Sequence, residues 1–495
     1  MPVLLSLLTF IFALLPFTLG PSSPFFTLDQ EIVYVTNALS YVVRKQIPFY
    51  DHPGTPHIVG LAAAYTPLRL WAKYVVHTPF IDWSIQNFTF LNYYSRVFAL
   101  AVYGLGLTIF LSAVYRFTQS RLTVLLSWLC LFAYSEFLRN GVRTVPENYL
   151  MLSTAIWIWL FLWLVQKPIL IRFLVLSVAG GLALATKFNS LTIVLITWIH
   201  AGLFLTRRRW RLWLVIVGMT VMGFVISTWP IRSHYISMFN WTYSLASHLE
   251  PSGSGKQDWF DLEVTRTSLK TMLQQEPYLL PFFFMTPVIY LVSLRRLSPN
   301  LRLAFGVAII FIEIFFFIYA KYPRPHYQLL HFLVLSAITA VLLNRSKILV
   351  LLFIVLLTPL MIYRVRTHAA WSKNLGYLAK FEQFISSHPP RYRTLWLISN
   401  TRDFSLLWGR GWSGEFYGSQ LDRYYPKIGE MVGFDTYRDN AARTYPLFSV
   451  CWDQLYLRAS ELNQFLAAYP ERQFQVTGIE NTKYYLITTD HCKDL

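Results

Sequence analysis

Long apolar stretches alternate with short polar segments along the first three quarters of the chain. About 20 apolar residues are needed for a helix to cross the hydrocarbon core of a membrane, and eleven stretches approach this length. They are 3–20, 96–115, 122–138, 148–166, 172–186, 190–206, 212–229, 278–294, 303–320, 328–343 and 348–363. The pattern predicts an all-α, polytopic membrane domain over 1–367 with about eleven transmembrane helices.

The pattern changes at about residue 368, where polar and turn-forming residues become frequent. Lys373–His388 and the segment that begins at Ser460 have helical patterns. Thr394–Asn400 and Lys483–Asp490 have the composition of strands. We therefore expect a small C-terminal α/β domain over 368–495.

Composition and charge placement support a membrane protein. With 55% hydrophobic and only 14% charged residues, the chain has more apolar surface than a soluble domain could bury. The formal charge of +18 could suggest nucleic acid, but the basic residues lie in short loops between apolar stretches. Five alternate loops contain Lys or Arg and no Asp or Glu, namely 116–121, 167–172, 207–211, 295–302 and 345–347. Such loops face the cytoplasm, so the remaining loops and the C-terminal domain are expected outside it, and no nucleic-acid partner is expected.

The first outer loop, 21–95, needs a separate argument. Residues 3–20 lack a preceding basic region and a clear cleavage site, which favours a retained helix over a cleaved signal peptide. Segment 55–76 is apolar but contains Pro67, Arg69 and Lys73. Counting it as a span would invert every later loop, so we predict a juxtamembrane helix lying in the membrane interface.

Acidic residues gather in this first outer loop, next to hydrocarbon, where carboxylates are costly. Asp29, Glu31 and Asp51 lie there, and Asp51 precedes a turn of sequence HPGTP that begins at His52. Such placement indicates a functional site. Asp29 and Glu31 share a side only on an extended chain or at a helix start. The alternative is that both are acids favoured by the dipole of a helix N-terminus.

Charged side chains recur in later outer loops. Arg139, Arg143 and Glu147 follow a spacing of four, which predicts one shared helix face that Pro146 ends. The alternative is a solvated salt bridge, above all for Arg139. Lys187 lies in a very short outer turn, where it could bind an anion or merely extend to the interface.

The outer loop 321–327, KYPRPHY, is the most basic of these segments. It places Lys321, Arg324 and His326 on a turn stiffened by two prolines, directly before Tyr327. Such cations can anchor helices at the interface, but a rigid cluster of them suits a phosphate. His331, one turn further, is a candidate partner of Tyr327.

Metal-binding spacing is absent from the sequence. Cys130 lies within an apolar stretch, and Cys451 and Cys492 lie near the C-terminus. No CxxC or Cys/His spacing typical of zinc occurs. Cys451 and Cys492 could form a disulfide if the tail is extracytoplasmic.

The order of these motifs resembles protein O-mannosyltransferases and the bacterial lipid A aminoarabinose transferases, which are glycosyltransferases of the GT-C fold. The matching pieces are Asp29-Gln30-Glu31, Asp51-His52-Pro53-Gly54, Arg96, Arg143 to Glu147, Gly181-Leu182-Ala183 with Lys187-Phe188, and Arg324-Pro325-His326-Tyr327. The likeness covers most of residues 1–340. Gln30 separates two acids that are adjacent in the family, and Glu147 stands where relatives carry Asp. The first departure leaves open whether Asp29 or Glu31 corresponds to the catalytic acid.

The resemblance implies inverting transfer of a sugar from a polyprenyl-phosphate donor, outside the cytoplasm. Asp29 is the expected base, with Glu31 and Glu147 orienting an acceptor that is a lipid, a glycan or a protein. Arg324, Lys321 and Lys187 are expected to bind the donor phosphate, and His326 and Tyr327 to position donor or sugar. Asp51, His52 and Arg143 are the expected substrate-loop residues. No cofactor is required by the resemblance, although a pair of outer acids could hold a divalent cation.

Two other classes of function fit some of these features. A transporter or flippase of a lipid-linked sugar could use the same basic groove, but the chain shows neither inverted repeats nor broken helices near the midplane, and its charges gather at one face. A non-catalytic scaffold would leave the acids and the basic loop unexplained. The expected location is a bacterial inner membrane, with the site on the outer face, and the endoplasmic reticulum is the alternative.

Overall fold

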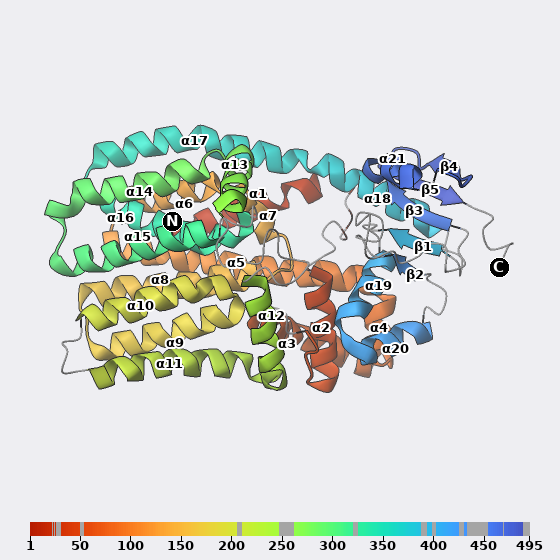
Figure 1. Ribbon diagram of the computed structural model, residues 1–495, viewed down its shortest axis with the longest axis horizontal. Helices are drawn as coiled ribbons and strands as arrows, with labels where there is room; N and C mark the ends of the chain where they lie inside the picture. The colour runs from red at the N-terminus through yellow and green to blue at the C-terminus, as the bar shows by residue number, and fades with distance from the viewer. Residues whose placement is uncertain are drawn as a thin grey trace. The chain divides into compact units, whose positions relative to one another are not determined.

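The computed structural model describes residues 1–21, 23, 25, 31–49, 54–204, 210–246, 262–319, 325–387, 394–397, 402–424, 430–432, 454–468 and 470–488. The eleven apolar stretches are helical (Figure 1), although the stretch 122–138 is interrupted at 134–135. These helices are α1 (Pro2–Thr18), α5 (Phe88–Thr118), α6 (Arg121–Cys130), α8 (Glu147–Gln166), α9 (Leu170–Thr186), α10 (Leu191–Phe204), α11 (Trp210–Thr228), α14 (Leu279–Ser293), α15 (Pro299–Tyr319), α16 (Leu329–Leu343) and α17 (Lys347–Ala370).

The helices have the length and composition of a multi-pass membrane protein. Within the described residues, five are long and apolar enough to cross a membrane, and five shorter apolar helices accompany them. The protein is thus an integral membrane protein with several spans. The number eleven for the crossings, and their orientation, stay predictions.

The chain divides into two compact units, of which the first comprises residues 1–14, 50–60 and 96–368. Helix α16 is its core: every residue from Leu329 to Leu343 is buried, and the helix packs against α6, α8, α14 and α15. A helix that is apolar on all sides, as its sequence LLHFLVLSAITAVLL is, has no face suited to water and is expected to be enclosed by other helices.

Helices α9 and α11 approach each other closely in this unit. A Cβ atom on Gly181 would lie 2.1 Å from the Thr220 carbonyl oxygen, and one on Gly223 would lie 2.6 Å from the Val178 carbonyl oxygen. Glycine is required at both positions, because only small residues let membrane helices meet at backbone distance. This contact fixes the end of α9, after which Lys187 follows.

Short elements connect the long helices of the first unit. They are η2 (Leu131–Ala133), α7 (Glu136–Gly141), η3 (Phe188–Ser190), η5 (Trp229–His234), α12 (Tyr235–Ala246), α13 (Leu262–Gln275), η6 (Leu294–Arg296) and η7 (Pro325–Gln328). The predicted juxtamembrane segment is helical, as α3 (Thr55–Trp71) and the π-helical turn η1 (Ala72–Val76). Its place in the membrane interface stays a prediction.

The second unit comprises residues 15–49, 61–95 and 369–495. Its helices are α2 (Glu31–Arg44), α4 (Phe80–Gln86), α18 (Ser372–Ser387), α19 (Arg402–Trp412), α20 (Gly414–Tyr424) and α21 (Ala459–Ala468). Its strands are β1 (Thr394–Leu397), β2 (Glu430–Val432), β3 (Gln454–Arg458), β4 (Gln475–Gly478) and β5 (Tyr484–Thr488). The small α/β architecture and the helices and strands expected at 373–388, 394–400, 460 and 483–490 are confirmed over the described residues.

The sheet of the second unit is mixed. Its order is β2-β1-β3-β5-β4, in which β1 is parallel to β2 and β3, while β5 is antiparallel to β3 and β4. Phe381 of α18 stacks on Tyr484 of β5 with ring centroids 3.9 Å apart, so α18 is held on the sheet by aromatic packing. Cys451 and Cys492 lie outside the described residues, and the assignment of domains to 1–367 and 368–495 stays a prediction.

Candidate active site

A buried ion pair joins two of the predicted outer loops of the first unit. The Lys187 ammonium donates a hydrogen bond to the Glu147 carboxylate, and the side chains are only 8% and 2% exposed. Glu147 is the first residue of α8, where the helix dipole favours a negative charge. Lys187 follows α9 with an extended backbone, at φ −160° and ψ 137°. The two ends of the helices thus bring together residues 40 positions apart in sequence.

Tyr327 adds a third loop to this pair. The Lys187 Nζ lies 4.9 Å from the centroid of the Tyr327 ring, at cation–π distance. The Tyr327 carbonyl oxygen accepts a hydrogen bond of 2.8 Å from the Asn189 side chain. These contacts link η7 to the turn that carries Lys187. Glu147, Lys187 and Tyr327 are therefore neighbours, while the roles predicted for them stay predictions.

His331 supports the same junction from inside the bundle. Its Nε2 lies 2.9 Å from the Thr192 hydroxyl, and its Nδ1 lies 2.8 Å from the Gln328 side-chain oxygen. Thr192 is in α10 and Gln328 ends η7, so the imidazole ties the two elements together. The contacts given for the His331 ring are to Thr192 and Gln328, and its partnership with Tyr327 stays a prediction.

The start of α3 is the fourth segment at this place. The Gly54 N–H donates 3.0 Å to the carbonyl oxygen of Thr186, the residue before Lys187. His57 is fully buried, with its ring centroid 5.5 Å from that of Tyr149 in α8. Burial lowers the pKa of His57 to about 3, although the nearby Glu147 carboxylate and a backbone hydrogen bond at Thr144 oppose the shift. His57 is thus neutral at physiological pH. No role was predicted for His57 from the sequence.

The prediction that Arg139, Arg143 and Glu147 share one helix face is wrong. Helix α7 ends at Gly141 and α8 begins at Glu147, so the segment between them is not helical. Pro146 explains this, because a proline lacks the N–H that a helix interior needs and disfavours helix in the residue before it.

Both arginines pair with Glu136 instead. Arg139 Nη1 lies 3.1 Å from one carboxylate oxygen of Glu136, and Arg143 Nη1 lies 2.9 Å from the other. Arg139 is the more exposed of the two, so its interpretation as a solvated salt bridge is confirmed. Sequence reasoning missed Glu136.

A further ion pair, of a buried glutamate and a partly buried arginine, lies in the same unit. Arg364 Nη2 of α17 is 2.8 Å from Glu276 Oε2, which also accepts a 3.2 Å hydrogen bond from the Ser135 N–H. Burial raises the pKa of Glu276 to about 7, while the charge of Arg364 opposes the rise. Neither residue was singled out from the sequence, because nothing in the spacing of 276 and 364 announces a contact.

The other predicted site residues are placed only in part. Glu31 is buried and is the first residue of α2 in the second unit, a helix start that fits both its predicted site role and the helix-dipole alternative. The backbone of His326 lies in η7, and its side chain is outside the described part. Asp29, Asp51, His52, Lys321 and Arg324 lie outside the described residues.

The described side chains do not include a candidate metal site. Among those residues there is no group of three His, Cys, Asp or Glu side chains that could hold a metal ion. Asp29 is not among them, so a divalent cation at the outer acids stays a hypothesis.

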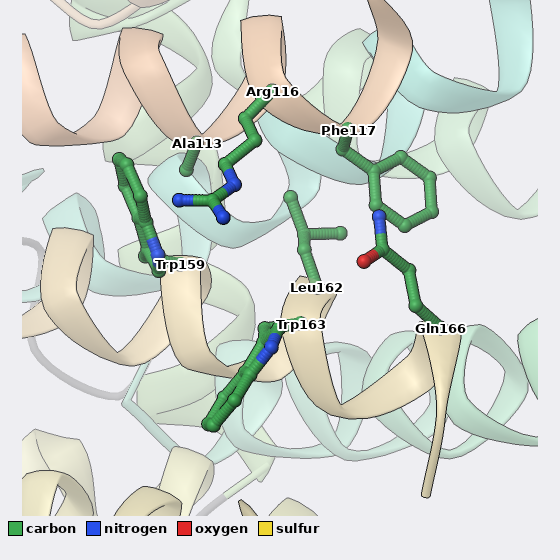
Figure 2. A pocket seen from close by; sticks show the side chains of 7 residues that line it. All are labelled: Ala113, Arg116, Phe117, Trp159, Leu162, Trp163 and Gln166. Carbon is green, nitrogen blue, oxygen red and sulfur yellow. The ribbon is translucent and has the colours of Figure 1, made fainter.

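A small pocket lies at the other end of α8 (Figure 2). It has a volume of about 20 Å³ and is lined by Ala113, Arg116, Phe117, Trp159, Leu162, Trp163 and Gln166. Room for about one water excludes a sugar. At 1.5 Å per residue, Trp159 lies about 18 Å along the helix from Glu147, so this pocket is separate from the ion pair. The Arg116 guanidinium is 5.6 Å from the Trp159 ring, an arrangement that suits a membrane interface.

Solved structures to which the chain is similar include two of ArnT from Cupriavidus metallidurans. The crystal structure bound to undecaprenyl phosphate aligns with a TM-score of 0.54 and 13% identity, over 99% of this chain and 97% of ArnT. The chain has the GT-C fold. The apo structure of ArnT gives a TM-score of 0.52 and 11% identity, over 98% and 97% of the two chains. No protein-family model and no curated protein sequence matches this chain. At such low identity the GT-C fold is what the likeness shows, and the reaction must be argued from residues.

Proposed function

We propose that this protein is a membrane glycosyltransferase that moves a sugar from a polyprenyl-phosphate donor to an acceptor hydroxyl, with inversion, on the outer face of the membrane. One observation carries the proposal. In a chain with the GT-C fold, the loops that hold Glu147, Lys187 and Tyr327 meet at one buried charged site. The ArnT structure bound to undecaprenyl phosphate supports the choice of donor class.

The reaction needs a base and a stabilised leaving group. Asp29 would take the proton from the acceptor hydroxyl, whose oxygen then forms a bond to the anomeric carbon. The bond between that carbon and the donor phosphate breaks, and the polyprenyl phosphate leaves with its negative charge. A phosphate leaving group requires positive charge nearby rather than a proton. Lys187, Lys321 and Arg324 would supply it.

The ion pair gives Glu147 a different role from acceptor binding. A lysine ammonium has three N–H donors, and Glu147 takes one of them while the Tyr327 ring covers a face. We propose that Glu147 and Tyr327 hold Lys187 so that a remaining N–H can meet the donor phosphate. Glu31 keeps its proposed role toward the acceptor, and Asp51, His52, Arg143 and His326 theirs toward donor or substrate loop. The acceptor is a lipid, a glycan or a protein, and a divalent cation at the outer acids remains part of the hypothesis.

Sugar transfer by the purified protein tests the proposal. Radiolabelled polyprenyl-phosphate sugars are incubated with wild type and Asp29→Asn in the presence of membrane acceptors. We expect release and transfer by wild type and loss of both in Asp29→Asn. The control is Asp422→Asn, which removes an exposed carboxylate of α20 and should leave transfer unchanged. Movement of the donor across vesicles without consumption would indicate a flippase instead.

The phosphate role has a test of its own. Arg324→Ala should weaken binding of the polyprenyl-phosphate sugar more than binding of the acceptor. If the variant binds the donor as tightly as wild type does, Arg324 does not bind the donor phosphate. Labelling of a cysteine introduced at Gly253 from outside sealed vesicles tests the orientation. A bacterial inner membrane is the proposed location and the endoplasmic reticulum the alternative.

A further inference from the structure

The second unit contains a cavity that the proposed transfer reaction does not use. Its volume is about 620 Å³, and residues of α2, α3, η1, α4 and α20 line it. Helices α2, α4 and α20 contact one another there, and η1 contacts α4. The cavity is large enough for the head group of a phospholipid, and ligand sites of this size combine a few polar groups with an apolar wall.

One wall is cationic. Arg69, Lys73 and His77 recur every four residues along the end of α3, through η1, and all three line the cavity. The Arg69 guanidinium donates 2.8 Å to the Val42 carbonyl oxygen, which fixes its position. The π-helical turn at Ala72–Val76 and the left-handed His77, at φ 56°, set the path of this wall. Short π-helical segments are frequent at functional sites, and a fixed guanidinium with a nearby ammonium suits a phosphate.

Asp82 of α4 also lines the cavity, and its carboxylate suits a cationic group rather than a phosphate. The residue is 4% exposed, and its Oδ1 has no hydrogen bond among the described residues. A buried carboxylate oxygen without a donor is costly, so the geometry calls for a ligand with N–H groups. A free phosphate would meet Arg69 and Lys73 but would be repelled by Asp82.

The surroundings are suited to acyl chains. Leu70, Trp71, Tyr74 and Val75 lie between the cationic residues in sequence and are all exposed, although they are not among the residues that line the cavity. Aromatic and aliphatic side chains beside Lys and Arg are typical of a segment at the membrane interface. This is the segment for which the sequence predicted an interfacial helix.

We propose that this cavity binds a phospholipid of the ethanolamine class. The phosphodiester meets Arg69 and Lys73, the primary ammonium donates to Asp82, and the acyl chains lie along Leu70 to Val75. The proposed lipid site takes no part in sugar transfer, and the proposal depends only on the residues named in this subsection.

Binding of soluble short-chain phospholipids to the purified full-length protein tests the site. Dihexanoyl phosphatidylethanolamine, phosphatidylcholine and phosphatidylglycerol are compared by calorimetry, with glycerophosphoethanolamine and inorganic phosphate as chain-free probes. We expect the ethanolamine lipid to bind about tenfold more tightly than the choline lipid, whose quaternary ammonium has no N–H for Asp82. Equal affinities, or tightest binding of phosphatidylglycerol, would overturn the role of Asp82. If inorganic phosphate binds as tightly as the ethanolamine lipid, the proposal that the site recognises a lipid is wrong.

Variants separate the two halves of the site. Asp82→Asn should abolish the preference for ethanolamine over choline while the phosphate contact persists. Lys73→Gln should weaken both lipids about tenfold, and Lys73→Arg should restore them. Lys380→Gln, an exposed lysine of α18, is the matched control and should bind like wild type. If Asp82→Asn does not fold, the two Lys73 variants decide, since unchanged binding in Lys73→Gln would contradict the site.

Discussion

Two ion pairs, one in each unit, show how burial changes what the same chemistry does. Lys187 and Glu147 are 8% and 2% exposed, and they join helix ends in the first unit. Arg410 and Asp422 are 51% and 50% exposed, and they join two surface helices of the second unit, with Arg410 Nη1 2.7 Å from Asp422 Oδ1. Because water barely reaches the buried pair, Lys187 and Glu147 depend on each other for their polar contacts.

The difference has a physical origin. An exposed pair exchanges contacts with water for a contact with its partner and gains little. A buried pair has lost water already, so that removal of one partner leaves an uncompensated charge in the interior. A buried pair is retained where the position of its charges matters. We therefore infer that Lys187 and Glu147 contribute to the proposed active site, whereas Arg410 and Asp422 form only a surface contact.

The largest expected effect is that of Lys187→Met. It leaves the Glu147 carboxylate buried without its cation, which should lower the free energy of unfolding by about 3–5 kcal/mol. Thermal unfolding of the purified protein measures the change. The double variant Glu147→Gln with Lys187→Met should recover most of the loss. A double variant as unstable as Lys187→Met would show that lost packing, rather than the unpaired charge, is responsible.

The pH dependence of stability at Glu276 tests the comparison between buried and exposed charges. Burial raises the pKa of its carboxyl from 4.5 to about 7, against the charge of Arg364. A raised pKa means that the folded state holds the proton more tightly, so this contribution is complete below pH 4.5 and is lost as pH rises through 7. Unfolding followed from pH 5 to 8 should show a loss on the order of 2 kcal/mol. Glu276→Gln cannot ionise and should flatten that slope, and an unchanged slope would assign the pH dependence elsewhere.

Arg143 and Arg139 provide an intermediate case, since both pair with Glu136. Arg143 is less exposed than Arg139. Arg143→Ala should therefore cost about 1 kcal/mol of stability and Arg139→Ala about half as much. Thermal unfolding of the two variants side by side measures the ratio, and a reversed order would mean that exposure does not rank these pairs.

The smallest effect is expected at the exposed pair. Arg410→Met should change the free energy of unfolding by less than about 0.5 kcal/mol, because water replaces the lost contact. The same unfolding assay serves as the control for Lys187→Met. A loss comparable with that of Lys187→Met would break the comparison.

The helices show how much a local pattern can predict. The stretch 148–166 became α8 at Glu147–Gln166, and 328–343 became α16 at Leu329–Leu343. Long apolar runs are strong local signals because a helix satisfies its own backbone hydrogen bonds. The strands were harder: β1 and β5 were predicted, whereas β2, β3 and β4 were not, although all five have three to five residues. A strand of three to five residues is defined by its partner, and pairing is not visible in local sequence.

The sequence by itself determined that this is a helical membrane protein, where its long helices lie, and which loops carry charge. It also placed Lys187, Glu147 and Tyr327 among the candidate site residues. Only the tertiary structure decided their partners: Glu147 meets Lys187 rather than Arg143, Arg143 meets the half-buried Glu136, and Glu276 and His57 join the buried polar set. The reason is that helix formation depends on neighbours in sequence, whereas a side-chain pair depends on which helix ends meet in space.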